Sequence, residues 1–379
     1  MPICSLVPAA EESYDDFGNL DSRGVTNVKA KLVLAICGLR FLLAAQTPHF
    51  EVDPSWPKPL PEGWITGQLG GVCTDSHDHI VVVNRRDITV EEAETSQQAP
   101  PIIMFDQAGN VIASWGDPNV VPHSIHGCAF DRENNVWVGG NDDGVIQKYS
   151  HEGKLLKQIG TRGSFDSSDG TSKGKSENGS RERFFNPAGI AIDPTNGDLY
   201  VADGYGNRRI AVFDRDGTFL RQWGRQASDE ETRTGAGGAF SRVVHCVVLG
   251  NDGFVYVCDR QGDRVQVFDK TGRFQRNIWI RTGTPTLPDP RGTAWWVEFS
   301  RDPQQKYMYV MNGRNEAVHI LEHGSGKILA SFGRPGHQLG NFIHGHTMAV
   351  DSHGNIYVAE TDWGRRIQRF TPSNAVQAH

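Results

Sequence analysis

The chain has 379 residues, with 43 Gly, 19 Pro and 9 Trp, and its formal net charge at pH 7 is −7. This length suffices for one large domain, and the many Gly and Pro residues favour short strands joined by tight turns over a helical bundle. The Lys and Arg residues are scattered along the chain, so the sequence carries no nucleic-acid-binding footprint. No apolar stretch reaches the length of a transmembrane helix.

The N-terminal segment resembles an export signal. Residues 29–46 read KAKLVLAICGLRFLLAAQ, in which two Lys precede an apolar run that ends in small residues. We therefore expect residues 1–47 to be a signal-like or disordered segment, and the exported protein, periplasmic or secreted, to begin near residues 46–48. A cytoplasmic protein with a disordered tail is the alternative, because Arg40 interrupts the apolar run.

From about residue 64 to residue 370 the chain repeats a unit of four strand-like runs. Each unit has a short apolar run, an Asp/Asn/Gly turn, a Val/Tyr/Trp run, a polar loop, an I-x-x-F run, a D-x-x-G turn and a last strand. Four copies are clear and two are diverged, and they begin near Gly70, His126, Gly189, His245, residue 293 and His346.

Six such units predict an all-β fold, a six-bladed β-propeller over residues 48–372 with a tail over residues 373–379. The pattern resembles the NHL-repeat class of propellers. The sixth unit stops at Phe370 without its last strand. We expect residues 48–60 to supply that strand, because pairing the N-terminus into the last blade protects edges that an open array exposes.

Two further features concern the cysteines and one insertion. Four Cys residues fall inside strand-like runs without a C-x-x-C pair, and we expect buried free thiols, with one disulfide as the alternative. They are Cys73, Cys128, Cys246 and Cys258. The insertion at residues 164–183 is polar and rich in Ser and Gly, which predicts a mobile surface loop, with a lid as the alternative.

Three histidines share one position of the repeat. His126, His245 and His346 each open a unit, in the second, fourth and sixth copies, whereas Gly70, Gly189 and a position near Trp296 take this place in the others. The innermost strands of a propeller line its channel, so alternate blades would bring three imidazoles together with threefold symmetry. This predicts an open three-ligand site for zinc or another divalent transition metal. Three satisfied polar side chains near the channel are the alternative.

Four more residues are candidates near this site. His123 and His344 lie close to two of the histidines in sequence, as second-shell partners or alternative ligands. Tyr205 lies in the loop after the second strand of the third unit, and Arg85 lies at a similar place in the first. A phenol beside a metal ion can act as a base, and an Arg can hold a carboxylate with two hydrogen bonds. The alternatives are that Tyr205 is an aromatic side chain packed in its loop and that Arg85 is a surface charge.

These motifs resemble those of the peptidyl-α-hydroxyglycine α-amidating lyase family, over about 300 residues. In that family three blade-opening histidines bind zinc, a tyrosine in a D-G-Y-x-N-x-R-I motif is catalytic, and so is an arginine in an x-R-x-D motif. The matching residues here are His126, His245 and His346 for zinc, Tyr205 in residues 203–210, and Arg85 before Asp87.

The resemblance implies a metal-dependent lyase that cleaves the C–N bond of a peptidyl-α-hydroxyglycine, or a related small carbinolamide, to an amide and glyoxylate. Tyr205 would be the base, with a hydroxide in the channel as the alternative, and Arg85 would hold the substrate carboxylate. The chain departs from the family at three positions. His344 replaces a Met, Gly206 replaces a disulfide-forming Cys, and Thr347 replaces an Asp that binds structural calcium, which leaves only backbone carbonyls for that ion.

Two other functions are compatible with the fold. One is a non-catalytic NHL-repeat propeller that binds a protein partner, because a propeller fold alone does not decide function. The other is a metal-dependent hydrolase such as a lactonase. It is less favoured, because six-bladed lactonases use calcium held by carboxylates whereas this channel offers imidazoles.

Overall fold

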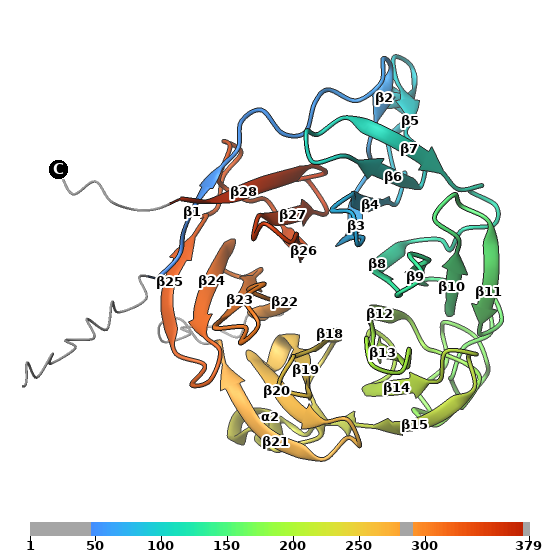
Figure 1. Cartoon of the computed structure of the whole chain (residues 1–379). Helices are drawn as coiled ribbons and strands as arrows, with labels where there is room; N and C mark the ends of the chain where they lie inside the picture. The colour runs from blue at the N-terminus through green and yellow to red at the C-terminus, as the bar shows by residue number, and fades with distance from the viewer. Residues whose placement is uncertain (1–46, 281–290, 374–379) are drawn as a thin grey trace, which may run out of the picture. The chain divides into compact units, whose positions relative to one another are not determined.

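The computed structural model describes residues 47–280 and 291–373. They form six four-stranded antiparallel sheets arranged as blades around a central channel (Figure 1). The protein is therefore the all-β six-bladed propeller that the repeat predicted. In each blade the first strand of the repeat is innermost, and the following strands lead outward.

The first three blades follow one another along the chain. Blade 1 contains β3 (Leu69–Thr74), β4 (Ile80–Asn84), β6 (Ile102–Phe105) and β7 (Val111–Trp115). Blade 2 contains β8 (Ile125–Phe130), β9 (Val136–Gly140), β10 (Val145–Tyr149) and β11 (Leu155–Ile159). Blade 3 contains β12 (Pro187–Ile192), β13 (Leu199–Asp203), β14 (Arg209–Phe213) and β15 (Phe219–Trp223).

The other three blades complete the ring. Blade 4 contains β18 (Val244–Leu249), β19 (Phe254–Asp259), β20 (Arg264–Asp269) and β21 (Phe274–Trp279). Blade 5 contains β22 (Ala294–Phe299), β23 (Tyr307–Asn312), β24 (Ala317–Glu322) and β25 (Ile328–Phe332). Blade 6 contains β26 (Gly345–Val350), β27 (Ile356–Glu360), β28 (Ile367–Ser373) and β1 (His49–Val52).

Strand β1 closes the ring. It pairs antiparallel with β28, with His49 opposite Ser373 and Val52 opposite Phe370. In Figure 1 the blue β1 lies beside the red β28. Residues 49–52, within the predicted range 48–60, therefore supply the missing strand of blade 6.

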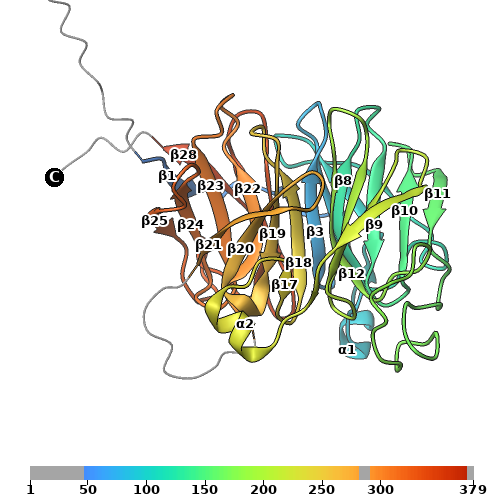
Figure 2. The same cartoon turned by 90° about the horizontal axis from the view of Figure 1, so that it is seen from below.

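The loops carry a few short elements. Two small parallel pairs join β2 (Trp64–Ile65) to β5 (Gln97–Gln98) and β16 (Arg225–Gln226) to β17 (Ala239–Phe240). The helices are α1 (Val90–Ala93), α2 (Asp229–Thr234) and the 3₁₀ turn η1 (Arg260–Gly262). Helices α1 and α2 lie at the same face of the propeller (Figure 2), which is the face reached by the loops after the second and fourth strands.

The innermost strands share a register shift that defines the channel-lining position. In every blade the first residue of the innermost strand pairs with the second strand, and the register of the pairing shifts one or two residues later. The residues directly after that first pair are Gly70, His126, Ala188, His245, Trp295 and His346. Ala188 and Trp295 thus replace the expected Gly189 and Trp296. The turns that follow these two strands are longer than the others, so counting back from the turn misplaces the position.

The expectation of buried free thiols is wrong. A Cys73–Cys128 disulfide joins the innermost strands of blades 1 and 2, with a Cα–Cα distance of 5.8 Å. A Cys246–Cys258 disulfide joins β18 to β19 within blade 4. Disulfides persist in oxidising compartments, so these two bridges point to an extracellular or secretory environment.

The insertion at residues 164–183 is held against blade 3. Asp166 is almost fully buried, and its Oδ2 accepts hydrogen bonds from the Gly179 amide at 2.9 Å and from Asn207 Nδ2 at 3.0 Å. The same oxygen lies 3.2 Å from Arg209 Nη2. A buried carboxylate with these partners fixes a segment whose polar composition had predicted a mobile loop.

Ion pairs with a buried carboxylate hold the loops that leave the second strands. A carboxylate at the end of the strand accepts from an Arg at the start of the third strand in blades 3, 4 and 6. The pairs are Asp203–Arg209 at 2.9 Å, Asp259–Arg264 at 2.8 Å and Glu360–Arg366 at 2.7 Å. The loops between these partners include Tyr205 and Arg260, so the pairs help to position the channel residues described next.

Candidate metal centre

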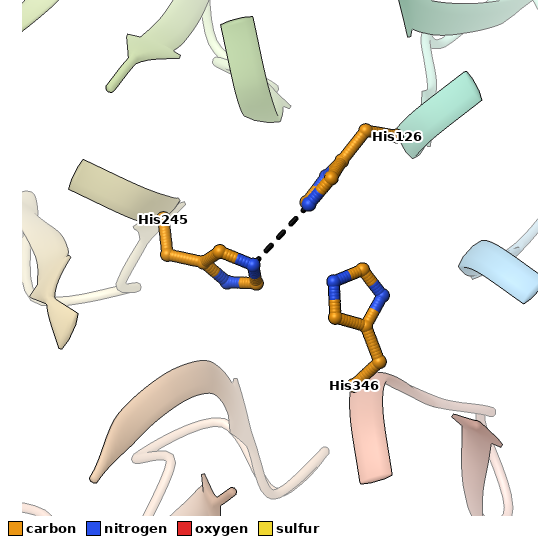
Figure 3. A group of neighbouring side chains, drawn as sticks. All are labelled: His126, His245 and His346. Carbon is orange, nitrogen blue, oxygen red and sulfur yellow. Dashed lines mark hydrogen bonds between the residues drawn. The ribbon is translucent and has the colours of Figure 1, made fainter. Parts of the chain in front are cut away.

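Three imidazoles converge in the central channel (Figure 3). His126, His245 and His346 lie at the start of β8, β18 and β26, and their exposed fractions are 0, 0 and 2%. Their ring centroids are 4.6 to 5.0 Å apart, and one ring nitrogen from each lies within 4.8 Å of the others. The structure thus brings together the three residues that share one repeat position on alternate blades.

The environment keeps these rings neutral. Burial lowers the pKa of His126 well below its usual value, and the neighbouring His346 and His245 lower it further. Burial is also the largest cause of the lowered pKa of His245 and of His346. Neutral imidazole is the form that binds metal ions, because its unprotonated nitrogen offers a lone pair.

The hydrogen bonds of the trio fit a bound divalent ion. His245 Nδ1 donates to the carbonyl oxygen of Trp295 at 2.6 Å, so its Nε2 carries the lone pair and lies 3.2 Å from His126 Nε2. Such a bond is the usual device that orients a metal-ligating histidine. The Nδ1 atom of His126 is buried without a hydrogen-bond partner among the described residues. Three buried, neutral and convergent imidazole nitrogens could hold a divalent metal ion.

Tyr205 places its phenol beside two of the imidazoles. Its Oη lies 3.3 Å from His126 Nε2 and 3.2 Å from His245 Nε2. Arg260 Nη1 donates to the same oxygen at 3.3 Å, and its guanidinium lies 4.8 Å from the centroid of the Trp295 ring. The phenol is therefore held between the trio and a fixed cation.

Arg85 lies at the edge of the same site. Its Nη1 donates to Gln68 Oε1 at 3.0 Å, and its Nε contacts the Ile125 carbonyl oxygen at 3.4 Å. Its charge contributes to the lowered pKa of all three channel histidines. Arg85 and Arg260 therefore give the channel positive charge, which suits an anionic ligand.

Sequence reasoning missed Arg260. It follows Asp259, the last residue of β19, just as Arg85 follows Asn84, the last residue of β4. Tyr205 lies one residue further from the end of its strand, so Arg260, rather than Tyr205, is the counterpart of Arg85. Counting from the end of the second strand, rather than from the loop, would have found it.

The remaining sequence candidates lie outside the trio. His123 is exposed, and its Nδ1 lies 3.3 Å from Asp143 Oδ1. His344 Nε2 lies 3.6 Å from Asp362 Oδ2. Thr347 is fully buried and offers a neutral hydroxyl where the amidating lyases carry the calcium-binding Asp. The structure therefore gives calcium no carboxylate at this position.

Comparison with known proteins identifies the repeat. The NHL repeat profile matches residues 184–213, which cover β12 to β14. The chain is a six-bladed β-propeller that contains an NHL repeat. Among solved structures, one titled "Streptogramin B lyase structure" superposes with a TM-score of 0.53 at 12% identity, covering 86% of this chain and 98% of the other. At this identity the similarity concerns the fold alone.

Distant relatives extend over most of the chain. NHL repeat-containing protein 3 from Homo sapiens is 27% identical, covering 86% of this chain and 85% of its own length. Peptidyl-glycine alpha-amidating monooxygenase B from Xenopus laevis is 26% identical over 87% of this chain, which spans only 36% of that protein. A probable peptidyl-alpha-hydroxyglycine alpha-amidating lyase from Caenorhabditis elegans is 24% identical, covering 80% of this chain and 82% of its own.

The described helices, in residues 47–280 and 291–373, are all too short or too polar to cross a membrane.

Proposed function

We propose that this protein is a metal-dependent lyase that cleaves the C–N bond of a peptidyl-α-hydroxyglycine or a related small carbinolamide, giving an amide and glyoxylate. The observation that carries the proposal is the convergence of His126, His245 and His346 with the phenol of Tyr205 3.2 to 3.3 Å from two of them. The distant similarity to amidating lyases supports the same reaction class.

The three histidines would hold zinc or another divalent transition metal. When bound, such an ion supplies Lewis-acid stabilisation of negative charge on the substrate's hydroxyl oxygen. The hydrogen bond from His245 to the Trp295 carbonyl keeps one ligand oriented before substrate arrives. Burial of the trio excludes bulk water, which strengthens each electrostatic interaction made there.

Tyr205 is the proposed base. In its phenolate form, Oη takes the proton of the substrate hydroxyl as the C=O bond of glyoxylate forms. The C–N bond breaks, its electron pair stays on nitrogen, and the nitrogen takes the proton back from Oη to give the amide. Arg260, which donates to the phenol oxygen at 3.3 Å, stabilises negative charge on Tyr205 and fixes the position of its oxygen.

Arg85 is the proposed partner of the substrate carboxylate. The carboxylate lies on the carbon atom that bears the hydroxyl, so a group that binds it must lie beside the metal and the base. Arg85 is half-buried and acts electrostatically on all three histidines. A guanidinium can hold a carboxylate with two parallel hydrogen bonds, which fixes the orientation of the substrate.

The proposed location is outside the cytoplasm, in the periplasm or in the medium, after removal of a signal peptide. The Cys73–Cys128 and Cys246–Cys258 disulfides support an oxidising compartment. The signal-like segment falls within residues 1–46, outside the described residues. Mass spectrometry of native material should find an N-terminus near residues 46–48, and an intact N-terminus would contradict the proposal.

The decisive experiment measures glyoxylate released from an α-hydroxyglycine derivative by zinc-loaded protein. We expect turnover that disappears after chelation and returns with zinc, and that is lost in His126→Ala. The matched control is His319→Gln, a substitution of another buried histidine that lies on β24 in blade 5. It should retain turnover. Metal-loaded protein without activity on any α-hydroxyglycine would instead favour a non-catalytic propeller.

A further inference from the structure

We propose a second site for a divalent transition metal, formed by Asp75, His79 and His151, with His77 as a fourth ligand. It lies on the face of the propeller opposite Tyr205. The turn from β3 to β4 and the turn from β10 to β11 share one face, whereas the loop from β13 to β14 reaches the other, because consecutive strands run antiparallel. The site is separate from the channel trio and does not depend on the proposed lyase activity.

Asp75 is the centre of this cluster. Its side chain is fully buried, and its Oδ1 accepts hydrogen bonds from the amides of His77 and His79, both at 2.8 Å. Its Oδ2 lies 2.9 Å from His79 Nδ1 and also 2.9 Å from His151 Nε2. One carboxylate oxygen therefore faces two imidazole nitrogens from two different blades, and the three ligand atoms lie within 4.8 Å of one another.

A third imidazole stands next to this group. His77 Nδ1 lies 3.9 Å from the same Asp75 oxygen, and its ring stacks on that of His79 with centroids 5.8 Å apart. His77 is exposed, so it can turn toward an ion without disturbing the core. Three imidazoles and one carboxylate form a mixed N/O set that suits zinc and related ions, and unlike an all-oxygen set it does not suit calcium or magnesium.

The two histidines that face Asp75 are accessible from solvent. The side chains of His79 and His151 are about one-third exposed, at 29 and 30%, so an ion can reach them from solvent.

The turn itself does not require a histidine at position 79. In blades 2 and 6 the corresponding turns begin at Asp131 and Asp351, and the residue four positions later is an Asn. Asn135 and Asn355 donate to the carboxylates of these aspartates at 3.1 and 2.7 Å. Asn therefore satisfies the same contact, and the imidazole of His79 adds a metal-binding group that the turn has no need of.

The contact between blades does not require a histidine at position 151. The corresponding residue of blade 4, Lys270, reaches back to Asp193 of blade 3 at 2.6 Å. A histidine at this position does not by itself form a cluster of metal ligands. His323, the corresponding residue of blade 5, forms a hydrogen bond with the hydroxyl of Tyr256 at 2.6 Å. Only between blades 1 and 2 does the described part of the chain place a second imidazole on the same carboxylate.

These comparisons supply substitutions that keep the structural contacts and remove the ligands. His79→Asn gives the turn of blade 1 the Asp–Asn contact that blades 2 and 6 have. His151→Lys gives blades 1 and 2 the Asp–Lys contact that joins blades 3 and 4. The experiment loads the chelator-treated full chain with Zn²⁺, removes free ion by dialysis, and counts bound zinc. We expect two equivalents for the wild type, one for His79→Asn/His151→Lys, and one for His126→Ala, which removes only the channel site.

A second measurement separates the two sites by their effect on folding. Zn²⁺ should raise the melting temperature of His126→Ala, because an ion that joins blade 1 to blade 2 stabilises only the folded state. The increase should disappear when His79→Asn/His151→Lys is added. If the double variant binds as much zinc as the wild type, or if the wild type binds only the equivalent that His126→Ala removes, the second site does not exist. Should the double variant melt much lower without metal, His151→Lys alone provides the test.

Discussion

Replacing Tyr205 with Phe removes one oxygen atom and leaves the ring in place. That oxygen has three polar neighbours, namely His126, His245 and Arg260, at 3.2 to 3.3 Å. If the phenol is the general base, the substitution should lower kcat by roughly 10²–10⁴, which corresponds to about 3–5 kcal/mol of lost transition-state stabilisation.

The same substitution should have little effect on the fold. The three contacts are long, and a hydrogen bond in a folded protein contributes about 1 kcal/mol net. The unfolding free energy of Tyr205→Phe should therefore change by about 1 kcal/mol or less. Its zinc content should equal that of the wild type, because the three histidines remain.

The assay is glyoxylate release under saturating substrate, with zinc content and urea unfolding measured on the same preparations. Tyr200→Phe is the matched control. Tyr200 is a buried tyrosine of the same blade, and its hydroxyl interacts with Arg221 Nη2 at 2.8 Å, away from the channel. Turnover at the wild-type level in Tyr205→Phe would refute the phenol as base. An equal loss in the control would show that the defect is structural.

Three further outcomes are expected. Replacing Cys73 and Cys128 with Ser should lower the unfolding free energy by about 4 kcal/mol in the chain-entropy estimate, because the disulfide closes a loop of 55 residues; urea denaturation measures this. Burial lowers the pKa of His319 from 6.5 to about 4. As the pH falls from 6.5 to about 4, this histidine is protonated in the unfolded chain but not in the folded protein, so the stability of the fold decreases over this range. His319→Gln should remove about 3 kcal/mol of that pH dependence, as checked by denaturation at both ends of the window. Gly70→Ala should destabilise the fold and reduce turnover together, since a β-carbon there would lie 1.8 Å from a carbonyl oxygen of blade 2 and 3.3 Å from Arg85 Nε.

The fold could be predicted from the sequence because its repeat makes the same contacts six times. Each unit carries the turn residues and strand pattern of one blade, and the missing strand after Phe370 indicated that the N-terminus must return. The three channel histidines were equally visible, since the same position on alternate blades means the same height in the channel. No knowledge of side-chain packing was needed for either conclusion.

Contacts between blades could not be read in the same way. The Cys73–Cys128 disulfide and the Asp75–His151 contact join residues far apart in sequence, and their distances depend on how adjacent blades pack. Arg260 was missed for a different reason. Its position relative to the strand end is the same as that of Arg85, but the loops after the second strands differ in length between blades, so the loop sequences alone do not bring the two residues into register.

The three channel positions without histidine make the candidate metal site asymmetric. Blades 1 and 3 carry Gly70 and Ala188 there, whereas blade 5 carries Trp295, which is buried and accepts the hydrogen bond from His245 through its carbonyl. The Trp295 ring lies beside the trio, with its centroid 5.7 Å from that of His245 and 6.0 Å from that of His346. Gly70 and Ala188 place no aromatic ring at the corresponding positions of blades 1 and 3.

That asymmetry agrees with the positions of the proposed catalytic groups. Arg85 follows the second strand of blade 1 and Tyr205 follows that of blade 3, so both belong to the blades that carry a small residue at the channel position. A ligand that approached the three imidazoles from this side would have the Tyr205 phenol on one side of blade 2 and the Arg85 guanidinium on the other. A purely structural ion would require only the three nitrogens. The joint placement of small residues, base and cation on one side is therefore the feature that favours catalysis over simple bracing of the channel.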